Sequence, residues 1–194
     1  MESNLELETD RVIIRRFTTK HWRRLHEIAM AYEASELAIY DHGPWPEEPE
    51  AYRELVQEWS QSDMVLAVIQ KSTKLLAGFI TLSKRKDGDY ELGYNFHPDA
   101  RGKGLATEAC SAVLAHVFEE SDIDRITAGT AKANTRSKRL LKKLGFVFLK
   151  ETVTSFRKDE IGKPIRFIGL DFELTRERWQ YHCASQNGKN RRTT

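Results

Sequence analysis

The stretch FHPDARGKGLATEACSAVLAHVF, from Phe96 to Phe118, changes character near its middle, and this junction constrains the fold more than any other segment. An extended run ends at a proline, a basic glycine loop follows, and a helical pattern begins at Gly104. Glycines at 102 and 104 permit backbone torsions and close approaches that side chains would block. The helix that follows offers unpaired N–H groups at its positive end. The junction therefore predicts a cradle for an anion.

Two basic side chains, Arg101 and Lys103, add charge beside these donors. A phosphate or pyrophosphate is therefore the expected guest, held mainly by the backbone amides of Gly102 to Ala106. The loop does not match the Walker pattern, because Gly104 follows Lys103 where serine or threonine is required. It does not match the Rossmann fingerprint either, because Glu108 stands about where the third glycine belongs.

Strand and helix patterns alternate on both sides of this junction. Apolar alternation and helical spacing predict the order β-α-α-β-β-β-α-β-α-β-β. The expected strands are 11–17, 64–70, 75–84, 89–97, 125–131, 146–157 and 165–174. The expected helices are 18–40, 50–59, 104–120 and 134–145. With 194 residues in all, we expect one domain over 1–180, followed by a polar, frayed tail over 181–194.

Composition excludes several classes of function. The formal net charge is +2, too small to favour nucleic acid as a direct partner. The two cysteines make no disulfide framework, and neither they nor the histidines show metal-ligand spacing. No window approaches the length of a membrane span, and the N-terminus lacks the pattern of a signal peptide. We therefore expect a cytoplasmic protein without metal or membrane partners.

The loop Arg101-Gly102-Lys103-Gly104-Leu105-Ala106 resembles the Arg/Gln-x-x-Gly-x-Gly/Ala loop that binds the pyrophosphate of coenzyme A in the GCN5-related N-acetyltransferase (GNAT) superfamily. The resemblance extends from about Leu5 to Leu174, in three further segments. LETDRVIIRRFTTKHW is similar to the opening of the RimJ/RimL-type branch, with its threonine and arginine. ELGYNFHPDARGKGLATEA is similar to that branch's central strand and loop, and NTRSKRLLKKLGF to its next helix.

This resemblance implies a mixed α/β fold, with a strongly twisted sheet of about seven strands and about four helices. Two central strands, 90–97 and 125–131, would splay apart, and the pantetheine arm of acetyl-CoA would fill the gap. Asn95 and Phe96 occupy the positions expected to bond this arm. Asn134 opens the helix after the second strand, where its side chain would either cap that helix or bond the pantetheine.

The chemistry implied by the resemblance is acetyl transfer to a primary amine, which must lose a proton before it attacks. Glu91 is the candidate base, acting directly or through a water, although a salt-bridged strand carboxylate is the alternative. Ser137 is the candidate donor to the coenzyme A thiolate, although it would equally pack within its helix. Many superfamily members carry a tyrosine where this chain has Leu141. Cys110 is a poor candidate for a covalent route.

The resemblance implies an acetyl-CoA-dependent N-acetyltransferase. We expect its acceptor to be the α-amino group of a protein N-terminus, as in ribosomal-protein acetylation. The alternatives are a small amine such as a polyamine or antibiotic, or a catalytically weak acyl-CoA sensor, which Leu141 favours. An acidic rim of Glu47, Glu48 and Glu50 with Trp45 as a wall would attract a cationic amine, unless this is only a solvated loop. The sequence leaves a homodimer open.

Overall fold

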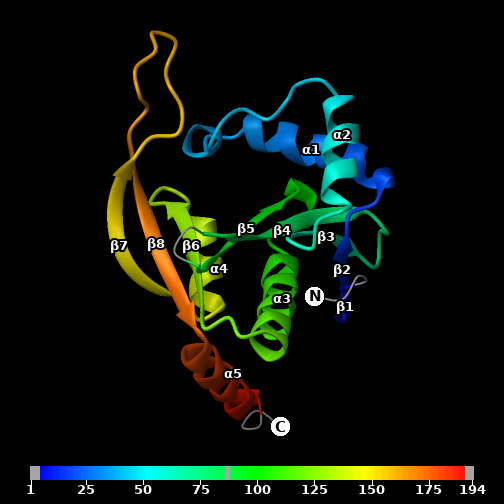
Figure 1. Ribbon diagram of the computed structural model, residues 1–194, viewed down its shortest axis with the longest axis vertical. Coiled ribbons are helices and arrows are strands. Elements are labelled where there is room, and N and C mark those ends of the chain that lie inside the picture. Colours follow the sequence, from blue (N-terminus) through cyan, green and yellow to red (C-terminus); the bar gives the residue numbers. More distant parts are fainter. Residues whose placement is uncertain (1–4, 86–87, 191–194) are drawn as a thin grey trace.

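The computed structural model describes residues 5–85 and 88–190, and side chains up to residue 186. It confirms the mixed α/β class, with eight strands and five α-helices in the described part of the chain (Figure 1). The strands are β1 (Glu6–Glu8), β2 (Val12–Arg16), β3 (Val65–Gln70), β4 (Leu76–Lys84), β5 (Tyr90–Phe96), β6 (Arg125–Ala131), β7 (Val147–Thr154) and β8 (Phe167–Thr175). The helices are α1 (Trp22–Glu33), α2 (Ala51–Trp59), α3 (Leu105–Glu120), α4 (Thr135–Lys143) and α5 (Arg176–Asn190).

All eight strands form one sheet in the order β1-β2-β3-β4-β5-β6-β8-β7. Neighbouring strands are antiparallel except β5 and β6, which run parallel. A parallel pair needs a crossover connection, and α3 supplies it. The predicted glycine loop therefore lies at the end of a central strand, at the start of the crossover helix.

Two apolar cores cover opposite faces of the sheet. The larger core packs α3 and α4 against one face and includes Leu92, Phe96, Leu114 and Leu141. The smaller core packs α1 and α2 against the other face, near β3 and β4, and includes Ile28 and Tyr52 as wholly or almost wholly buried residues. The alternation of apolar residues along β3 and β4 serves both cores, because successive side chains point to opposite faces, whereas β5 contributes its buried apolar residues to the larger core.

The parallel pair β5 and β6 is joined only at its beginning. Tyr90 pairs with Ile126 and Glu91 pairs with Thr127, and neither strand continues the pairing beyond these positions. Both strands nevertheless continue for several residues, so their later backbone groups face a gap. The predicted splay of the two central strands is confirmed.

Two elements were not predicted. Strand β1 has only three residues, two of them charged, and it exists because β2 pairs with it. Helix α5 begins at Arg176, inside the expected domain, and continues to Asn190 through most of the expected tail of 181–194. Its first turns are anchored, because Trp179 stacks on Phe118 and His182 Nε2 lies 3.0 Å from the carbonyl of Lys143. The last residues of the expected tail, 191–194, lie outside the described residues.

No helix in the described residues combines the length and the apolarity that crossing a membrane would require.

Candidate active site

The glycine loop, residues 101–104, has the torsions that the sequence predicts. Gly102 has φ of +73° and Gly104 has φ of +79°, in the left-handed region that favours glycine. Gly104 is the N-cap of α3, and no described side chain caps this helix. The first amides of α3 have no intrahelical acceptor, so they are available to an anion. Leu105 anchors the helix in the larger core.

Arg11 fixes the glycine loop from the N-terminal strands. Its Nη1 donates to the carbonyl of Lys103 at 2.8 Å, and its Nε and Nη2 each lie 2.6 Å from Glu108 Oε2. Thr9 Oγ1 also donates to Glu108 at 2.6 Å. Partial burial alone would raise the pKa of Glu108, but these hydrogen bonds and the charge of Arg11 together lower it. Arg11 thereby offsets a carboxylate that would repel an anion at this helix terminus.

The end of β5 is connected to the same loop by Arg101, whose Nε donates to the carbonyl of Phe96 at 3.1 Å. His97 donates its backbone N–H to Ala77 of β4. Because backbone groups alternate between the two edges of a strand, the N–H of Phe96 faces the gap, whereas that of Asn95 faces β4. Asn95 instead presents its side chain, which lines the cavity described next. Burial lowers the pKa of Arg101, although not enough to neutralise a guanidinium.

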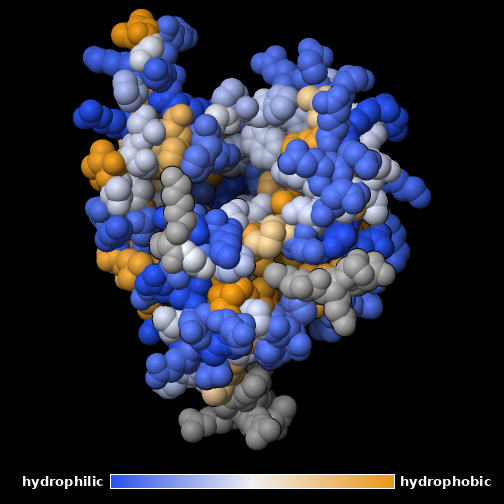
Figure 2. Space-filling view, viewed as in Figure 1, coloured by the Kyte–Doolittle hydropathy of each residue, from blue (hydrophilic) through white to orange (hydrophobic). Residues whose placement is uncertain are grey.

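A cavity of about 710 Å³ occupies the gap between the splayed strands, within the size range of small-molecule sites. It is lined by α1, β4, β5, β6, the start of α4, and the arm formed by β7 and β8. Figure 2 shows this face hollowed between that arm and the helices, with hydrophilic residues deep in the hollow. Among the lining residues, Asp41, Glu91 and Asp171 carry carboxylates and Arg85 carries a guanidinium. The lining therefore favours a cationic or neutral guest over an anionic one.

Glu91 lies where β5 leaves β6, and it lines the cavity. Its Oε2 accepts a hydrogen bond from Arg85 Nη1 at 2.8 Å, so the salt-bridged state considered from the sequence is present. Its Oε1 lies 3.4 Å from the place where a Cβ on Gly129 would stand. The absence of a side chain at Gly129 keeps space open beside the carboxylate. Glu91 is thus both ion-paired and accessible from the cavity.

The start of α4 brings two predicted residues into the cavity. Asn134 Oδ1 accepts from the backbone N–H of Ser137 at 3.0 Å, which makes Asn134 the helix cap. Asn134 also lines the cavity. Ser137 is buried, and its Oγ lies 2.8 Å from Tyr94 Oη. The sequence analysis did not single out Tyr94, although a polar tip on a strand face shared with Leu92 and Phe96 is a detectable signal.

The opposite end of the cavity is roofed by the proline loop, residues 41–46. Arg157, in the connection between β7 and β8, pairs both terminal nitrogens with the Glu33 carboxylate at 2.8 Å. Arg157 also donates to the carbonyls of Asp41 and Gly43. Glu33 in turn accepts from the backbone N–H of Trp45. The hydrogen bonds from Arg157 lower the pKa of Glu33, and partial burial opposes them only in part.

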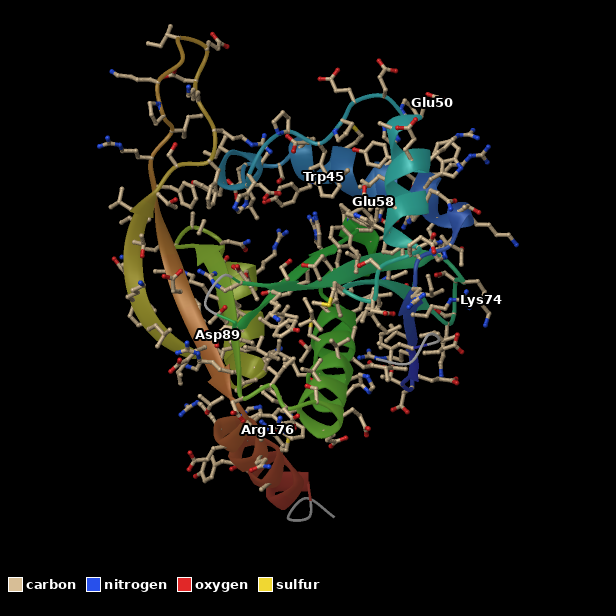
Figure 3. All side chains as sticks on the ribbon, viewed as in Figure 1. Trp45, Glu50, Glu58, Lys74, Asp89 and Arg176 are labelled. Carbon is tan, nitrogen blue, oxygen red and sulfur yellow. The ribbon has the colours of Figure 1, made fainter. Side chains whose placement is uncertain are left out.

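The acidic residues beside the two cavities are not the ones that the sequence predicts for an acidic rim. Trp45 lines the cavity and also packs against the smaller core, so both alternatives considered from the sequence are present. Figure 3 shows Trp45 on the proline loop and Glu50 near the start of α2. None of Glu47, Glu48 and Glu50 lines this cavity or the second cavity described next. A second, more open cavity of about 510 Å³ lies beside Trp45 and contains Glu54 and Glu58 instead. The helix α2 turns those two side chains toward the loop, and residues 47–50 precede it.

Cys110 is completely buried, and burial raises the pKa of its thiol. It is therefore not placed to act as a nucleophile. No cluster of three or more histidine, cysteine, aspartate or glutamate side chains suited to a metal ion occurs in residues 5–85 and 88–190.

Comparison with known proteins agrees with this geometry. The sequence profile described as Acetyltransferase (GNAT) domain matches residues 11–147, which span both the glycine loop and α4. This chain belongs to the GNAT acetyltransferase family. The prediction drawn from the glycine loop is therefore confirmed at the level of the family and of the enzyme class.

Individual GNAT relatives show the same relationship. The chain is 29% identical over 142 residues to the uncharacterized N-acetyltransferase YnaD of Bacillus subtilis (strain 168), covering 73% of this chain and 82% of YnaD. A crystal structure of a GNAT-family acetyltransferase from Bacillus anthracis superposes with a TM-score of 0.72 at 25% identity, covering 89% of this chain and 99% of that chain. The ribosomal-protein-S5-alanine acetyltransferase of Vibrio fischeri shares the fold, with a TM-score of 0.72 at 18% identity over 90% and 98% of the two chains.

Proposed function

We propose that this GNAT protein transfers the acetyl group of acetyl-CoA to the α-amino group of a protein N-terminus. The observation that carries the proposal is the position of Glu91, a carboxylate facing a cavity where the two central strands separate. GNAT acetyltransferases use acetyl-CoA, and the residues present fit it. The glycine loop and the uncapped start of α3 suit a pyrophosphate, and the splayed strands leave an edge for the pantetheine.

The residues that would hold acetyl-CoA fall into two groups. The amides of Gly102, Lys103, Gly104, Leu105 and Ala106 would bind the pyrophosphate, with Arg101 fixing the end of β5 beside them. The N–H of Phe96, the side chain of Asn95 and the amide nitrogen of Asn134 would bind the pantetheine arm. The thioester would then lie between Glu91 and Ser137, which line the same cavity from β5 and α4.

The chemistry requires an amine with a free lone pair. A primary amine is protonated near neutral pH, so Glu91 would take one proton from it, directly or through a water. The neutral nitrogen would then bond to the acetyl carbon while the carbon–sulfur bond breaks, the electron pair of that bond would go to sulfur, and the nitrogen would lose its second proton to water. Ser137 O–H would donate a hydrogen bond to the resulting thiolate. The three carboxylates of the lining would attract the cationic amine before it loses its proton.

The choice of a protein N-terminus over a small amine rests on the mouth of the cavity and on one structural relative. The cavity opens between the β7–β8 arm and the helices, where an extended chain can enter (Figure 2). The fold is shared with an enzyme whose name specifies the alanine of a ribosomal protein. Polyamines and antibiotics are the second class of acceptor, and an acyl-CoA sensor is the reading from a different functional class.

The test is thiol release from acetyl-CoA with four sets of acceptors: peptides with free N-termini, the same peptides blocked, polyamines and aminoglycosides. We expect release with the free peptides alone. Release only with small amines would overturn the proposed acceptor, and tight acetyl-CoA binding without release would favour the sensor.

Two matched variants test the base. Glu91→Gln should lower kcat by about 100-fold at neutral pH, the lower end of what a general base contributes, with the Kd for acetyl-CoA little changed. Asp171→Asn removes another carboxylate of the same lining and should cost far less. Equal losses in the two variants would show that the charge of the cavity matters and that Glu91 has no special role.

A further inference from the structure

Tyr94 is a buried polar group that the proposed chemistry does not yet use. It lies on β5, on the strand face that also carries Leu92 and Phe96, and these two residues belong to the core packed under α3 and α4. Its hydroxyl reaches across to α4, where Oη lies 2.8 Å from Ser137 Oγ. Both residues line the large cavity. The pair therefore joins the strand that carries Glu91 to the helix that carries the candidate donor.

Ser137 is held on two sides. Its backbone N–H is bonded to Asn134 Oδ1 at 3.0 Å, so the first turn of α4 is fixed, and its side chain is buried. A serine hydroxyl carries one hydrogen that rotates freely unless a neighbour orients it. If the Tyr94 phenol donates to Ser137 Oγ, the serine hydrogen must point elsewhere, and Ser137 lines the cavity, so that hydrogen can be directed into it.

Tyr94 keeps its own proton over the physiological range. Burial raises the pKa of its phenol, Cys110 from α3 acts in the same direction, and the bond to Ser137 of α4 opposes them only in part. A coenzyme A thiol resembles a cysteine thiol, with an ordinary pKa of about 8.5. Full transfer of the phenolic proton to the thiolate is therefore unfavourable, and Tyr94 is suited to donating a hydrogen bond.

We propose that Tyr94 positions Ser137: the phenol donates to Ser137 Oγ, and the serine O–H is thereby directed at the sulfur of the coenzyme. This inference rests on the proposed function of the same cavity. When the carbon–sulfur bond breaks, its electron pair goes to sulfur, and the oriented Ser137 O–H stabilises the thiolate until water protonates it. Leu141, one turn farther along α4, is fully buried in the core and carries no hydroxyl. The hydroxyl that contacts Ser137 is that of Tyr94, on β5.

The first experiment measures turnover. Tyr94→Phe removes only the hydroxyl, and it should lower kcat by about fivefold while the KM for acetyl-CoA stays within about twofold, as expected for one lost hydrogen bond. Ser137→Ala should lower kcat at least as much. The double variant should be no slower than Ser137→Ala, because Tyr94 acts only through the serine. Tyr90→Phe, the same change on the same strand outside the cavity lining, is the matched control and should leave kcat unchanged.

The second experiment does not depend on an acceptor. The ultraviolet absorbance of the thiolate reports the acid dissociation constant of coenzyme A bound to the protein. Binding to the wild type should increase this constant about tenfold, because one hydrogen bond to the anion is gained. Tyr94→Phe should remove at least about a threefold part of this increase, and Tyr90→Phe none of it.

These readouts separate two failures. If no amine releases thiol but the titration shows the Tyr94-dependent increase, the proposed transferase is wrong and the positioning role stands. If Tyr94→Phe changes neither kcat nor the thiol titration and lowers only the Tm, the bond is purely structural and the inference is overturned. Multiplicative losses in the double variant would overturn it as well.

Discussion

The glycine loop and the proline loop are each held by an arginine that pairs with a glutamate, yet the two pairs are built differently. Arg11 and Glu108 fix the glycine loop, and the Arg11 side chain remains 52% exposed. Arg157 and Glu33 fix the proline loop, and their side chains are only 15% and 20% exposed. Arg157 makes four hydrogen bonds, two to Glu33 and two to backbone carbonyls of the loop.

This difference in exposure matters for two reasons. Solvent screens an exposed ion pair and so weakens it. Breaking a buried pair leaves one partner without its hydrogen bonds, which raises the free-energy cost. The glycine loop also has its own support, since its glycines and the start of α3 impose its conformation locally. The proline loop has one local hydrogen bond from the Tyr52 hydroxyl to the carbonyl of Pro46, but its Arg157 contacts come from an arm that is distant in sequence. Substitutions should therefore disturb the cavity more under the proline loop, where the acceptor would bind, than at the glycine loop.

The largest effect should follow from Arg157→Ala. Removal of this guanidinium leaves Glu33 with the backbone N–H of Trp45 as its remaining donor among the described residues and removes a donor from two carbonyls, and it should lower the free energy of unfolding by about 1 to 3 kcal/mol. The KM for the acceptor should rise by about tenfold, about 1.4 kcal/mol, because the roof of the cavity is released, while the KM for acetyl-CoA changes little. Thermal unfolding and steady-state kinetics measure both. Lys158→Ala, an exposed neighbour, is the control.

A smaller effect, on the KM for acetyl-CoA instead of the KM for the acceptor, should follow from Arg11→Ala. The Arg11 side chain is 52% exposed, although that of Glu108 is only 18% exposed, so solvent screens the pair and the stability loss should stay below about 1 kcal/mol. The KM for acetyl-CoA should rise by roughly fivefold, because the Lys103 carbonyl is released and Glu108 is left uncompensated beside the pyrophosphate site, whereas the KM for the acceptor should not move. Adding Glu108→Gln should recover part of this loss. If the double variant is worse than Arg11→Ala, the carboxylate is not what repels the coenzyme.

The smallest effect concerns pH. The pKa values of Glu33 and Glu108 are both lowered in the folded protein, so the stability that each pair contributes is present above the ordinary carboxyl pKa and is lost as pH falls through the folded value. The difference in unfolding free energy between the wild type and Arg157→Ala should therefore be constant from about pH 8 to 6 and shrink below about pH 4. A difference that changes between pH 8 and 6 would implicate another titrating group.

Much of the structure around the glycine loop could be predicted from the sequence. The positive φ angles at Gly102 and Gly104 and the free amides of α3 depend on neighbours within a few residues, so the local pattern specifies them. The threonine and arginine near the N-terminus were known only as a resemblance. The structure supplies their reason, because Thr9 and Arg11, in the turn between β1 and β2, both bind Glu108.

The contacts that hold the proline loop and those within the cavity could not be predicted in the same way. Glu33 and Arg157 are 124 residues apart, and no local pattern marks either residue as half of a pair. Tyr94 and Ser137 meet only because β5 and α4 pack against the same core. Asp171 enters the cavity from β8 because the strand order places β8 beside β6.

The sequence by itself determined the order of the elements from β2 to β8, the glycine torsions and free amides at the start of α3 and, through these, the GNAT family of the chain. Only the tertiary structure decided which side chains share the cavity and which arginine holds each loop. The physical reason is range: torsional preference and helix capping act between neighbours in the chain, whereas ion pairs and buried hydroxyl contacts form between groups that only the folded sheet brings together.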